Sequence, residues 1–172
     1  LKSLKMKTNL KSFKNENIER IYQLINKTNQ FNLTTKRMNI NETKKIINNS
    51  SFLSIVGNLT DKFGENGIVT ILIAKIKKNK KEIIQWLMSC RVFNRGLEFA
   101  VFDQLISWCK NKSISTIHGF YIPTKKNLIV KNFYENLNFK KIDKNTKNTK
   151  WEFKINKNYI KRNNTIKVDC EN

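Results

Sequence analysis

The sequence predicts a mixed α/β fold, with one mostly antiparallel central sheet of about seven strands and helices on both of its faces. Three apolar, strand-like runs, 52–59, 67–76 and 82–90, follow one another with short polar connections, which indicates an antiparallel meander. After them, apolar residues recur at helical spacing from Leu97 to Lys112, and a helix with so wide an apolar face packs on a sheet. A chain of 172 residues is normally one domain and is long enough to bury such a core.

The remaining elements follow from the same periodicities and from turn signals. Asn66-Gly67 is expected to form the turn of the first hairpin of the meander. The other predicted elements are helices over 16–29, about 42–49 and about 125–136, and strands over 115–121, 139–142 and 151–155. For the domain organisation we expect a linker and edge strand over 1–14, a single domain over 15–160, and a loosely ordered tail over 161–172.

The formal net charge of +21 invites a nucleic-acid function. The excess is nearly all lysine, however, and it is spread over the whole chain. Lys, Asn and Ile have A/T-rich codons, so genome composition accounts for the bias. The interleaving of basic and aromatic residues that is typical of RNA-binding modules is absent from the sequence. We therefore expect no specific nucleic-acid partner, while nonspecific attraction to acidic partners persists at low salt.

Cys90, Cys109 and Cys170 are an odd number without paired spacing, which argues against a disulfide framework. With a single His, a metal site is not expected either. A reducing, cytoplasmic setting fits best. The sequence shows neither a bilayer-spanning apolar run nor a signal peptide, so we expect no membrane partner. The chain begins at Leu1 rather than Met, which suggests a part of a longer polypeptide.

The most informative segment for function is the stretch Arg91-Val-Phe-Asn-Arg-Gly96. It lies between a predicted strand and the 97–112 helix, where free backbone N–H groups and the helix dipole favour an anion. Gly96 lets a ligand approach the backbone closely, and Arg91 and Arg95 offer donors suited to phosphate oxygens. The stretch is therefore a candidate cradle for a pyrophosphate, although a strand-to-helix turn with a glycine is also common.

This order of elements, with the anion loop before the third long helix, resembles the GNAT acyltransferase superfamily. In that family the loop motif is Gln/Arg-x-x-Gly-x-Gly/Ala and holds the pyrophosphate of coenzyme A. Here Asn94 and, further on, Asn138 stand where glycine is usual, and Asn tolerates the left-handed backbone. The resemblance implies acetyl-CoA, or another acyl-CoA or phosphopantetheine thioester, as cofactor, with Tyr134 as general acid to the departing thiolate. The cofactor-binding residues that it implies are Met88, Cys90, Arg91, Val92, Asn94, Arg95, Gly96 and Asn127, the last of these on the pantetheine arm.

The stretches 23–37, 63–67, 89–96 and 123–127 together resemble the C-terminal domain of FkbH-like proteins, in which a HAD-type domain precedes a GNAT-like domain. That family is linked to loading glyceryl units onto an acyl carrier protein. The resemblance therefore implies an acyl carrier protein and an N-terminal HAD-like domain as partners. In GNAT proteins the loop after the first helix walls the acceptor site. The substrate residues that this implies are Asn29, Gln30, Phe31 and Asn32, whose many amides suit a polar acyl group.

Cys90 and Tyr134 are candidate catalytic residues, and each has two possible interpretations. Cys90 is either a small core residue at a strand end or a nucleophile that takes the acyl group as a thioester. Tyr134 is either a half-buried aromatic residue of a helix or the general acid. No convincing general base is evident in the sequence. The expected function is that of an acyltransferase domain, and the alternatives are a non-catalytic carrier-protein docking module of a HAD–GNAT fusion and a basic nucleic-acid-binding domain.

Overall fold

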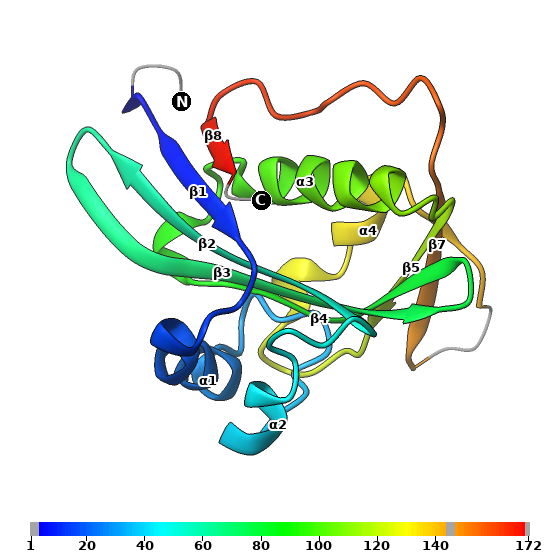
Figure 1. The fold of residues 1–172 in the computed structure, drawn as a ribbon, viewed down its shortest axis with the longest axis horizontal. Helices are drawn as coiled ribbons and strands as arrows, with labels where there is room; N and C mark the ends of the chain where they lie inside the picture. Colours follow the sequence, from blue (N-terminus) through cyan, green and yellow to red (C-terminus); the bar gives the residue numbers. More distant parts are fainter. Residues whose placement is uncertain (1–3, 144–146, 171–172) are drawn as a thin grey trace.

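The computed structural model describes residues 4–143 and 147–170, which form a strongly twisted sheet with helices on both faces (Figure 1). Within these residues the sheet has eight strands in the order β6-β7-β5-β4-β3-β2-β1-β8, one more than expected. The strands are β1 (Lys7–Lys11), β2 (Phe52–Asp61), β3 (Gly64–Lys77), β4 (Lys80–Met88), β5 (Thr116–Tyr121), β6 (Lys140–Lys141), β7 (Thr149–Lys154) and β8 (Lys167–Cys170). The helices are α1 (Ile18–Lys27), α2 (Ile40–Lys44), α3 (Leu97–Asn111) and α4 (Phe133–Asn136), with 3-10 turns η2 (Asn15–Asn17), η3 (Cys90–Val92) and η4 (Leu128–Val130).

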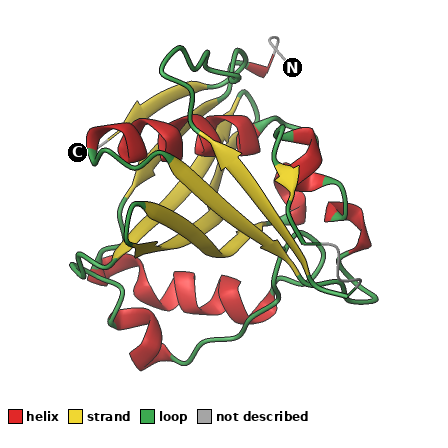
Figure 2. Ribbon diagram, turned by 90° about the vertical axis from the view of Figure 1, so that its right-hand side faces the viewer, coloured by secondary structure: helices red, strands yellow, loops and turns green. Residues whose placement is uncertain are grey.

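The core lies in two layers, because α1 and α2 cover one face of the sheet and α3 and α4 cover the other (Figures 1 and 2). The larger layer packs under α3 and includes Trp86 and Phe102. The smaller layer packs under α1 and includes Ile21 and Ile25. Strands β2, β3 and β4 are buried on both faces over much of their length, which explains why their sequences read as nearly continuous apolar runs.

The predicted meander is present, but its first turn lies earlier than Asn66-Gly67. Asp61 pairs with Gly64 across the turn, and the Phe63 backbone N–H donates to Asp61 Oδ1 over 2.8 Å. This side-chain hydrogen bond favours the turn at Asp61. Asn66 and Gly67 lie inside β3, where the two of them stand opposite Leu59 in a β-bulge, and Gly67 takes a left-handed φ of 65°.

The predicted helices over 16–29 and 97–112 correspond to α1 and α3, whereas the other two are shorter than expected. Helix α2 begins with a reciprocal capping box, in which Asn39 accepts from the Glu42 N–H and the Glu42 carboxylate accepts from the Asn39 N–H. The predicted helix at 125–136 is two short segments, η4 and α4. The β-branched pair Ile129-Val130 has low helix propensity, which accounts for the interruption.

Strand β1 is not an edge strand, contrary to the prediction for residues 1–14. It lies between β2, with which it is antiparallel, and β8, with which it is parallel. Met6, Thr8 and Leu10 alternate inward and are buried, while the lysines at 5 and 7 face solvent. This period of two was obscured in the sequence because polar Thr8 holds one of the inward positions. Residues 1–3 lie outside the described part of the chain.

The C-terminal segment is a strap across α3 rather than the predicted loose tail (Figure 1). Asp103 on α3 accepts hydrogen bonds from the Tyr159 hydroxyl over 2.6 Å and from the backbone N–H groups of Arg162 and Asn163 over 2.9–3.0 Å. The strap then ends as β8, which pairs with β1. The sequence does not predict this arrangement, because the strap is held by the buried carboxylate of Asp103 and by pairing with β1, 160 residues away. Residues 171–172 lie outside the described residues.

Replacing Asp103 by Ala is expected to lower the free energy of unfolding by about 3 kcal/mol, because the change leaves three donors without their acceptor. Urea unfolding of the two proteins measures the difference. Asp103→Asn, which keeps one acceptor oxygen, should lose about half as much. Equal stability of the wild type and Asp103→Ala would mean that the strap contributes nothing to folding.

Candidate functional site

The loop between β4 and α3 has the backbone geometry of an anion site. Asn94 and Gly96 take left-handed φ angles of 59° and 79°, so the expectation that Asn94 replaces a glycine in an unusual conformation is confirmed. In the described part of the chain the N-cap residue, Gly96, gives α3 no side-chain cap, and the Phe99 N–H donates to the Gly96 carbonyl over 3.1 Å. The helix dipole favours an anion at this end. Arg91 is exposed at the start of the loop. These features suit an anion between Arg91 and the start of the helix.

Arg95 does not serve this loop in the way that the sequence suggested. Its guanidinium forms an ion pair with the buried carboxylate of Asp61 at the end of β2. The Phe63 backbone N–H and this guanidinium hold the pKa of Asp61 below its usual range. The donors of Arg95 are therefore directed toward the β2–β3 turn, and Arg91 is the arginine of the motif that faces solvent.

A carboxylate already lies at the N-terminus of α3. Glu98 is in the first turn, is half-buried, and has a hydrogen bond to its own backbone N–H. Burial raises the pKa of Glu98 above its usual value. A negative side chain at this place stabilises the helix but competes with any phosphate that approaches the same N–H groups. The backbone of the loop thus favours an anion, whereas the negative charge of Glu98 disfavours one.

Strands β4 and β5 diverge beside the loop. They pair in parallel only from Lys80 to Glu82 on β4, so the rest of β4 has a second edge that β5 does not cover. The backbone N–H of Met88 and the carbonyl of Trp86 point from this edge into the gap, where they bond to Phe31 and Leu33. Met88, which the resemblance implied as a cofactor-binding residue, therefore lies at the opening between the two strands.

A cavity of about 290 Å³ adjoins this opening and brings several predicted residues together. The cavity is lined by Lys27, Thr28, Asn29, Gln30, Phe31, Met88, Ser89, Cys90 and Phe93. Cys90 is an exposed, free cysteine on η3 and not a core residue, so the alternative of a buried role is not supported. Candidate substrate residues from the α1–α2 loop thus meet the candidate nucleophile and β4 in one place.

Asn32 and Asn127, by contrast, are fully buried and bonded to the protein. The Asn127 side chain donates to the carbonyl oxygens of Asn32 and Ile122 over 2.9 Å each, and its oxygen accepts from the Thr124 N–H over 2.7 Å. The Asn32 oxygen accepts from the Thr35 N–H over 2.9 Å. Both side chains hold loops in place, and their predicted contacts with a substrate or a pantetheine arm would require these bonds to break.

Tyr134 packs inside the core and does not line the cavity. Its ring lies directly over Gly119 of β5, and its buried hydroxyl lies by the backbone of Phe120. Burial raises the pKa of Tyr134 above its usual value. The neighbouring residue on α4, Phe133, is the one that faces β4, with its ring centroid 4.7 Å from that of Trp86. The general-acid role of Tyr134 stays a prediction, and it requires the hydroxyl to turn out of this packing.

Sequence reasoning missed four residues of the cavity wall: Lys27, Thr28, Ser89 and Phe93. Phe93 could have been predicted from the sequence, because it is a large apolar residue inside a polar loop that is expected to bind a ligand.

His118 is bonded to Glu152 on β7, with Nε2 and Oε2 3.0 Å apart, and lies outside this cavity, in line with a structural role. Over residues 4–143 and 147–170 there is no cluster of three metal-ligating side chains and no helix long and apolar enough to cross a bilayer.

Solved structures with the same fold include acetyltransferases. The ribosomal-protein-S18-alanine N-acetyltransferase from Escherichia coli is 11% identical, with 89% of this chain and 99% of that chain covered and a TM-score of 0.63. The PaiA N-acetyltransferase from Thermoplasma acidophilum in complex with coenzyme A is 14% identical, with 86% and 99% covered and a TM-score of 0.66. A GNAT-family acetyltransferase from Staphylococcus aureus is 14% identical, with 86% and 98% covered and a TM-score of 0.64.

No family model and no curated protein matches the sequence. At identities of 11–14% the structural likeness establishes the fold. The chain has a GNAT-like fold, and the prediction of a mostly antiparallel sheet with helices on both faces is confirmed. The narrower resemblance to FkbH-like proteins stays a prediction.

Proposed function

We propose that this chain is an acyltransferase that takes its acyl group from a pantetheine thioester. The observation that carries the proposal is that the left-handed loop 91–96 and the edge of β4 that β5 leaves uncovered adjoin one cavity. A phosphate on the loop and a thioester beside Met88 would lie at the two ends of one pantetheine arm. Two structures with the same fold, the PaiA N-acetyltransferase and a spermidine N-acetyltransferase from Vibrio cholerae, were solved with coenzyme A, which supports a pantetheine-containing donor.

The residues present fit a pantetheine arm with a single phosphate better than they fit the pyrophosphate of coenzyme A. Arg91 attracts one phosphate, whereas the carboxylate of Glu98 opposes the larger negative charge of a pyrophosphate at the same helix terminus. When bound, the thioester supplies an activated acyl carbon. The chain's own part is to orient the carbonyl along β4 and to donate backbone N–H groups to its oxygen.

Cys90 is the proposed acceptor within the chain. Its sulfur forms a bond to the acyl carbon, the bond from that carbon to the pantetheine sulfur breaks, and the thiol proton passes to the departing sulfur. The wall of the cavity, with Asn29, Gln30 and Thr28, suits a small hydroxylated acyl group such as a glyceryl unit. Intact-protein mass spectrometry after incubation with an acyl thioester detects the adduct, and a Cys90→Ser protein shows whether Cys90 carries it.

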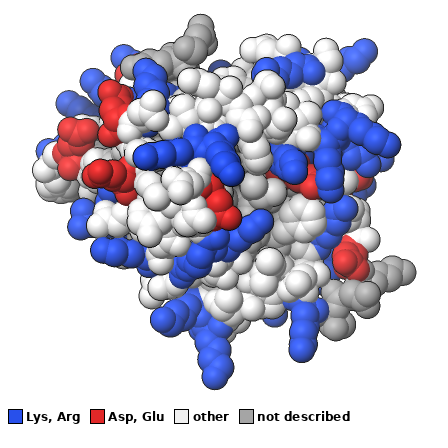
Figure 3. All heavy atoms as spheres, turned by 60° about the horizontal axis from the view of Figure 1, so that its bottom comes forward, with Lys and Arg blue, Asp and Glu red and all other residues white. Residues whose placement is uncertain are grey.

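A carrier-protein docking module is the second candidate, and an exposed apolar surface at η4 favours it. Leu128 and Ile129 are exposed by 62% and 65%, and three exposed lysines, at 125, 126 and 131, surround them. A surface of this kind suits an acidic helix with an apolar face, which acyl carrier proteins present. Lysines and arginines also spread over the face that carries α1 and α2, where acidic residues are fewer (Figure 3). Turnover by this chain separates the enzyme from the docking module.

Replacing Glu98 by Gln is expected to strengthen coenzyme A binding about tenfold, or about 1.4 kcal/mol, because it removes the charge that opposes the pyrophosphate. Because the pKa of Glu98 is raised, coenzyme A should also bind the wild type more tightly as the pH falls toward that pKa, and the variant should lose this dependence. Isothermal titration measures both effects.

Pantetheine, which has no phosphate, is the matched control ligand. Its affinity should be the same for the wild type and Glu98→Gln at every pH. If Glu98→Gln changes the affinities of both ligands equally, the carboxylate does not face the pyrophosphate, and the assignment of the loop as a phosphate site fails.

A further inference from the structure

The gap between β4 and β5 is occupied by a segment of the chain itself, Phe31–Leu33 from the loop between α1 and α2. The Met88 N–H donates to the Phe31 carbonyl over 3.0 Å, and the Leu33 N–H donates to the Trp86 carbonyl over 3.1 Å. On the other side, the Ile122 N–H donates to the Leu33 carbonyl over 2.9 Å. The segment therefore takes the place of a short strand between β4 and the end of β5, with Asn32 opposite Leu87.

The side chain of Phe31 closes the same space. Its ring centroid lies 5.6 Å from that of Phe93 on the β4–α3 loop and 5.2 Å from that of Phe133 on α4. Phe133 in turn lies edge-on to Trp86. The space between the anion loop, β4 and α4 is thus filled by packed aromatic rings, and a flexible arm that runs from the loop to β4 has no room beside them.

Further hydrogen bonds hold the segment and the residue after it, but the backbone at Thr35 is strained. Asn127 donates to the Asn32 carbonyl, and the Thr34 hydroxyl donates to the Ile84 carbonyl over 3.0 Å. Thr35, which follows directly, has a left-handed φ of 49°. A β-branched residue is disfavoured in this conformation, so the folded loop stores strain that its release would relieve.

We propose that Phe31–Leu33 is an internal plug that an acyl-pantetheine arm must displace before its thioester carbonyl can accept a hydrogen bond from the Met88 N–H. The inference rests on the proposed function, because it takes the edge of β4 as the place of the thioester. The Met88 N–H is a single donor, and the Phe31 carbonyl already accepts from it. A ligand carbonyl that binds there competes with the chain's own carbonyl for the same hydrogen.

The plug makes acyl transfer conditional on an opening step. A ligand that binds only the open state has an apparent dissociation constant equal to its intrinsic constant divided by the open fraction. A change that weakens the plug therefore strengthens binding by the factor by which it raises that fraction, even though it adds no contact to the ligand. The same opening removes Phe31 from the path between the cavity and β4.

Hydrogen exchange of two amides tests the displacement directly in the 172-residue protein. Without ligand, the amides of Leu33 and Met88 are both expected to be protected, because each donates inside the gap. With saturating S-acetylpantetheine, which has the thioester carbonyl, and a Cys90→Ala protein, which cannot be acylated at that position, the Leu33 amide should exchange at least tenfold faster, while the Met88 amide stays protected by its new acceptor. If both amides keep their protection in a protein that is demonstrably saturated, the plug stays in place and the inference is wrong, while the proposed function stands.

Phe31→Ala tests the energetic coupling. The smaller side chain loses its contacts with Phe93 and Phe133, so pantetheine should bind at least fivefold more tightly than to the wild type. Phe63→Ala is the matched control, since Phe63 is 79% exposed in the β2–β3 turn, and it should bind like the wild type. Unchanged or weaker binding by a folded Phe31→Ala protein overturns the plug. If pantetheine and coenzyme A bind to neither the wild type nor Phe31→Ala, the proposed function itself fails.

Discussion

Replacing Gly119 by Ala is expected to lower the free energy of unfolding by about 3 kcal/mol, at the upper end of what overpacking usually costs. An added Cβ would lie 2.2 Å from Cε1 and 2.3 Å from Cζ of Tyr134. The ring cannot move aside, because it is fully buried and packs against Phe139 and Trp151. Only a shift of α4 away from β5 would relieve the contact.

Urea unfolding measures this loss of stability. Two further variants test whether the contact with Tyr134 causes it. Gly57→Ala should cost less, about 1 kcal/mol, because the atoms that its Cβ would meet are the flexible end of Leu10 and the Thr70 methyl group. In a double-mutant cycle, Tyr134→Leu should recover at least 1.5 kcal/mol of the Gly119→Ala loss. If the effects of Gly119→Ala and Tyr134→Leu on the free energy of unfolding are additive, the Tyr134 ring does not contact the Cβ at position 119. The packing over Gly119 would then not hold the Tyr134 hydroxyl in place.

The parts of the fold that the sequence predicted are those with long, regular patterns. The 15 residues of α3 have apolar residues at helical spacing, and the three meander strands are nearly continuous apolar runs with short polar connections. The left-handed conformations at Asn94 and Asn138 were also predictable, because Asn is among the few residues that tolerate φ > 0.

The parts that the sequence did not predict depend on contacts between distant residues. Strand β8 forms because Lys167–Cys170 pair with the outer edge of β1. Nothing in the sequence of these four residues alone indicates a strand. The strap before it depends on the single carboxylate of Asp103, which reads in sequence as one more polar residue of a helix. Long-range pairing of this kind leaves no periodicity to read.

For the candidate site, the sequence located the loop but not the side-chain directions. Spacing places Phe133 and Tyr134 on one short helix, yet a helix of four residues is too short for a periodic pattern to say which of them faces β4. Likewise, Asn32 and Asn127 read as ligand-binding amides, whereas the folded chain uses both to bond two loops together. The ion pair of Arg95 with Asp61 joins residues that are 34 positions apart.

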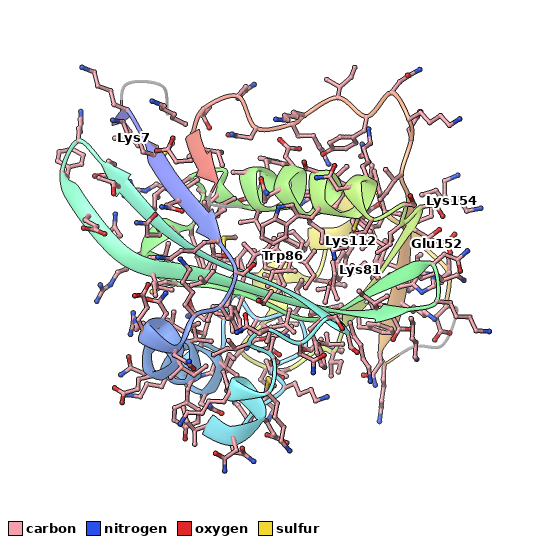
Figure 4. The ribbon with its side chains drawn as sticks, viewed as in Figure 1. Lys7, Lys81, Trp86, Lys112, Glu152 and Lys154 are labelled. Atoms are coloured by element: carbon pink, nitrogen blue, oxygen red, sulfur yellow. The ribbon has the colours of Figure 1, made fainter. Side chains whose placement is uncertain are left out.

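Replacing Lys81 by Met is expected to raise the free energy of unfolding at pH 7 by about 2–3 kcal/mol. Lys81 is fully buried between β4 and the end of α3, near Lys112 (Figure 4). In the described part of the chain its Nζ has no hydrogen-bond partner. Met has a similar volume and no charge, so it removes a buried, unpaired cation without leaving a cavity.

The pH dependence follows from the pKa of Lys81, which burial lowers from 10.5 to about 8. Below pH 8 the amine is charged in both the folded and unfolded chains, so the full penalty of burying the charge is present. Between pH 8 and 10.5 the folded chain has lost a proton that the unfolded chain still binds, so the stability of the wild type rises with pH. The advantage of Lys81→Met should therefore be largest below pH 8 and should shrink as the pH rises.

Urea unfolding between pH 6 and pH 9 tests this dependence. The upper limit is set by Cys109, whose pKa burial raises to about 12, because an unfolded thiol that ionises above pH 9 lowers stability and would mask the rise. Lys80→Met is the matched control, since Lys80 is the preceding residue on β4 and is exposed; its effect should stay within about 0.5 kcal/mol. If Lys81→Met is no more stable than the wild type at pH 7, the buried amine has a partner that compensates its charge, and the lowered pKa cannot hold.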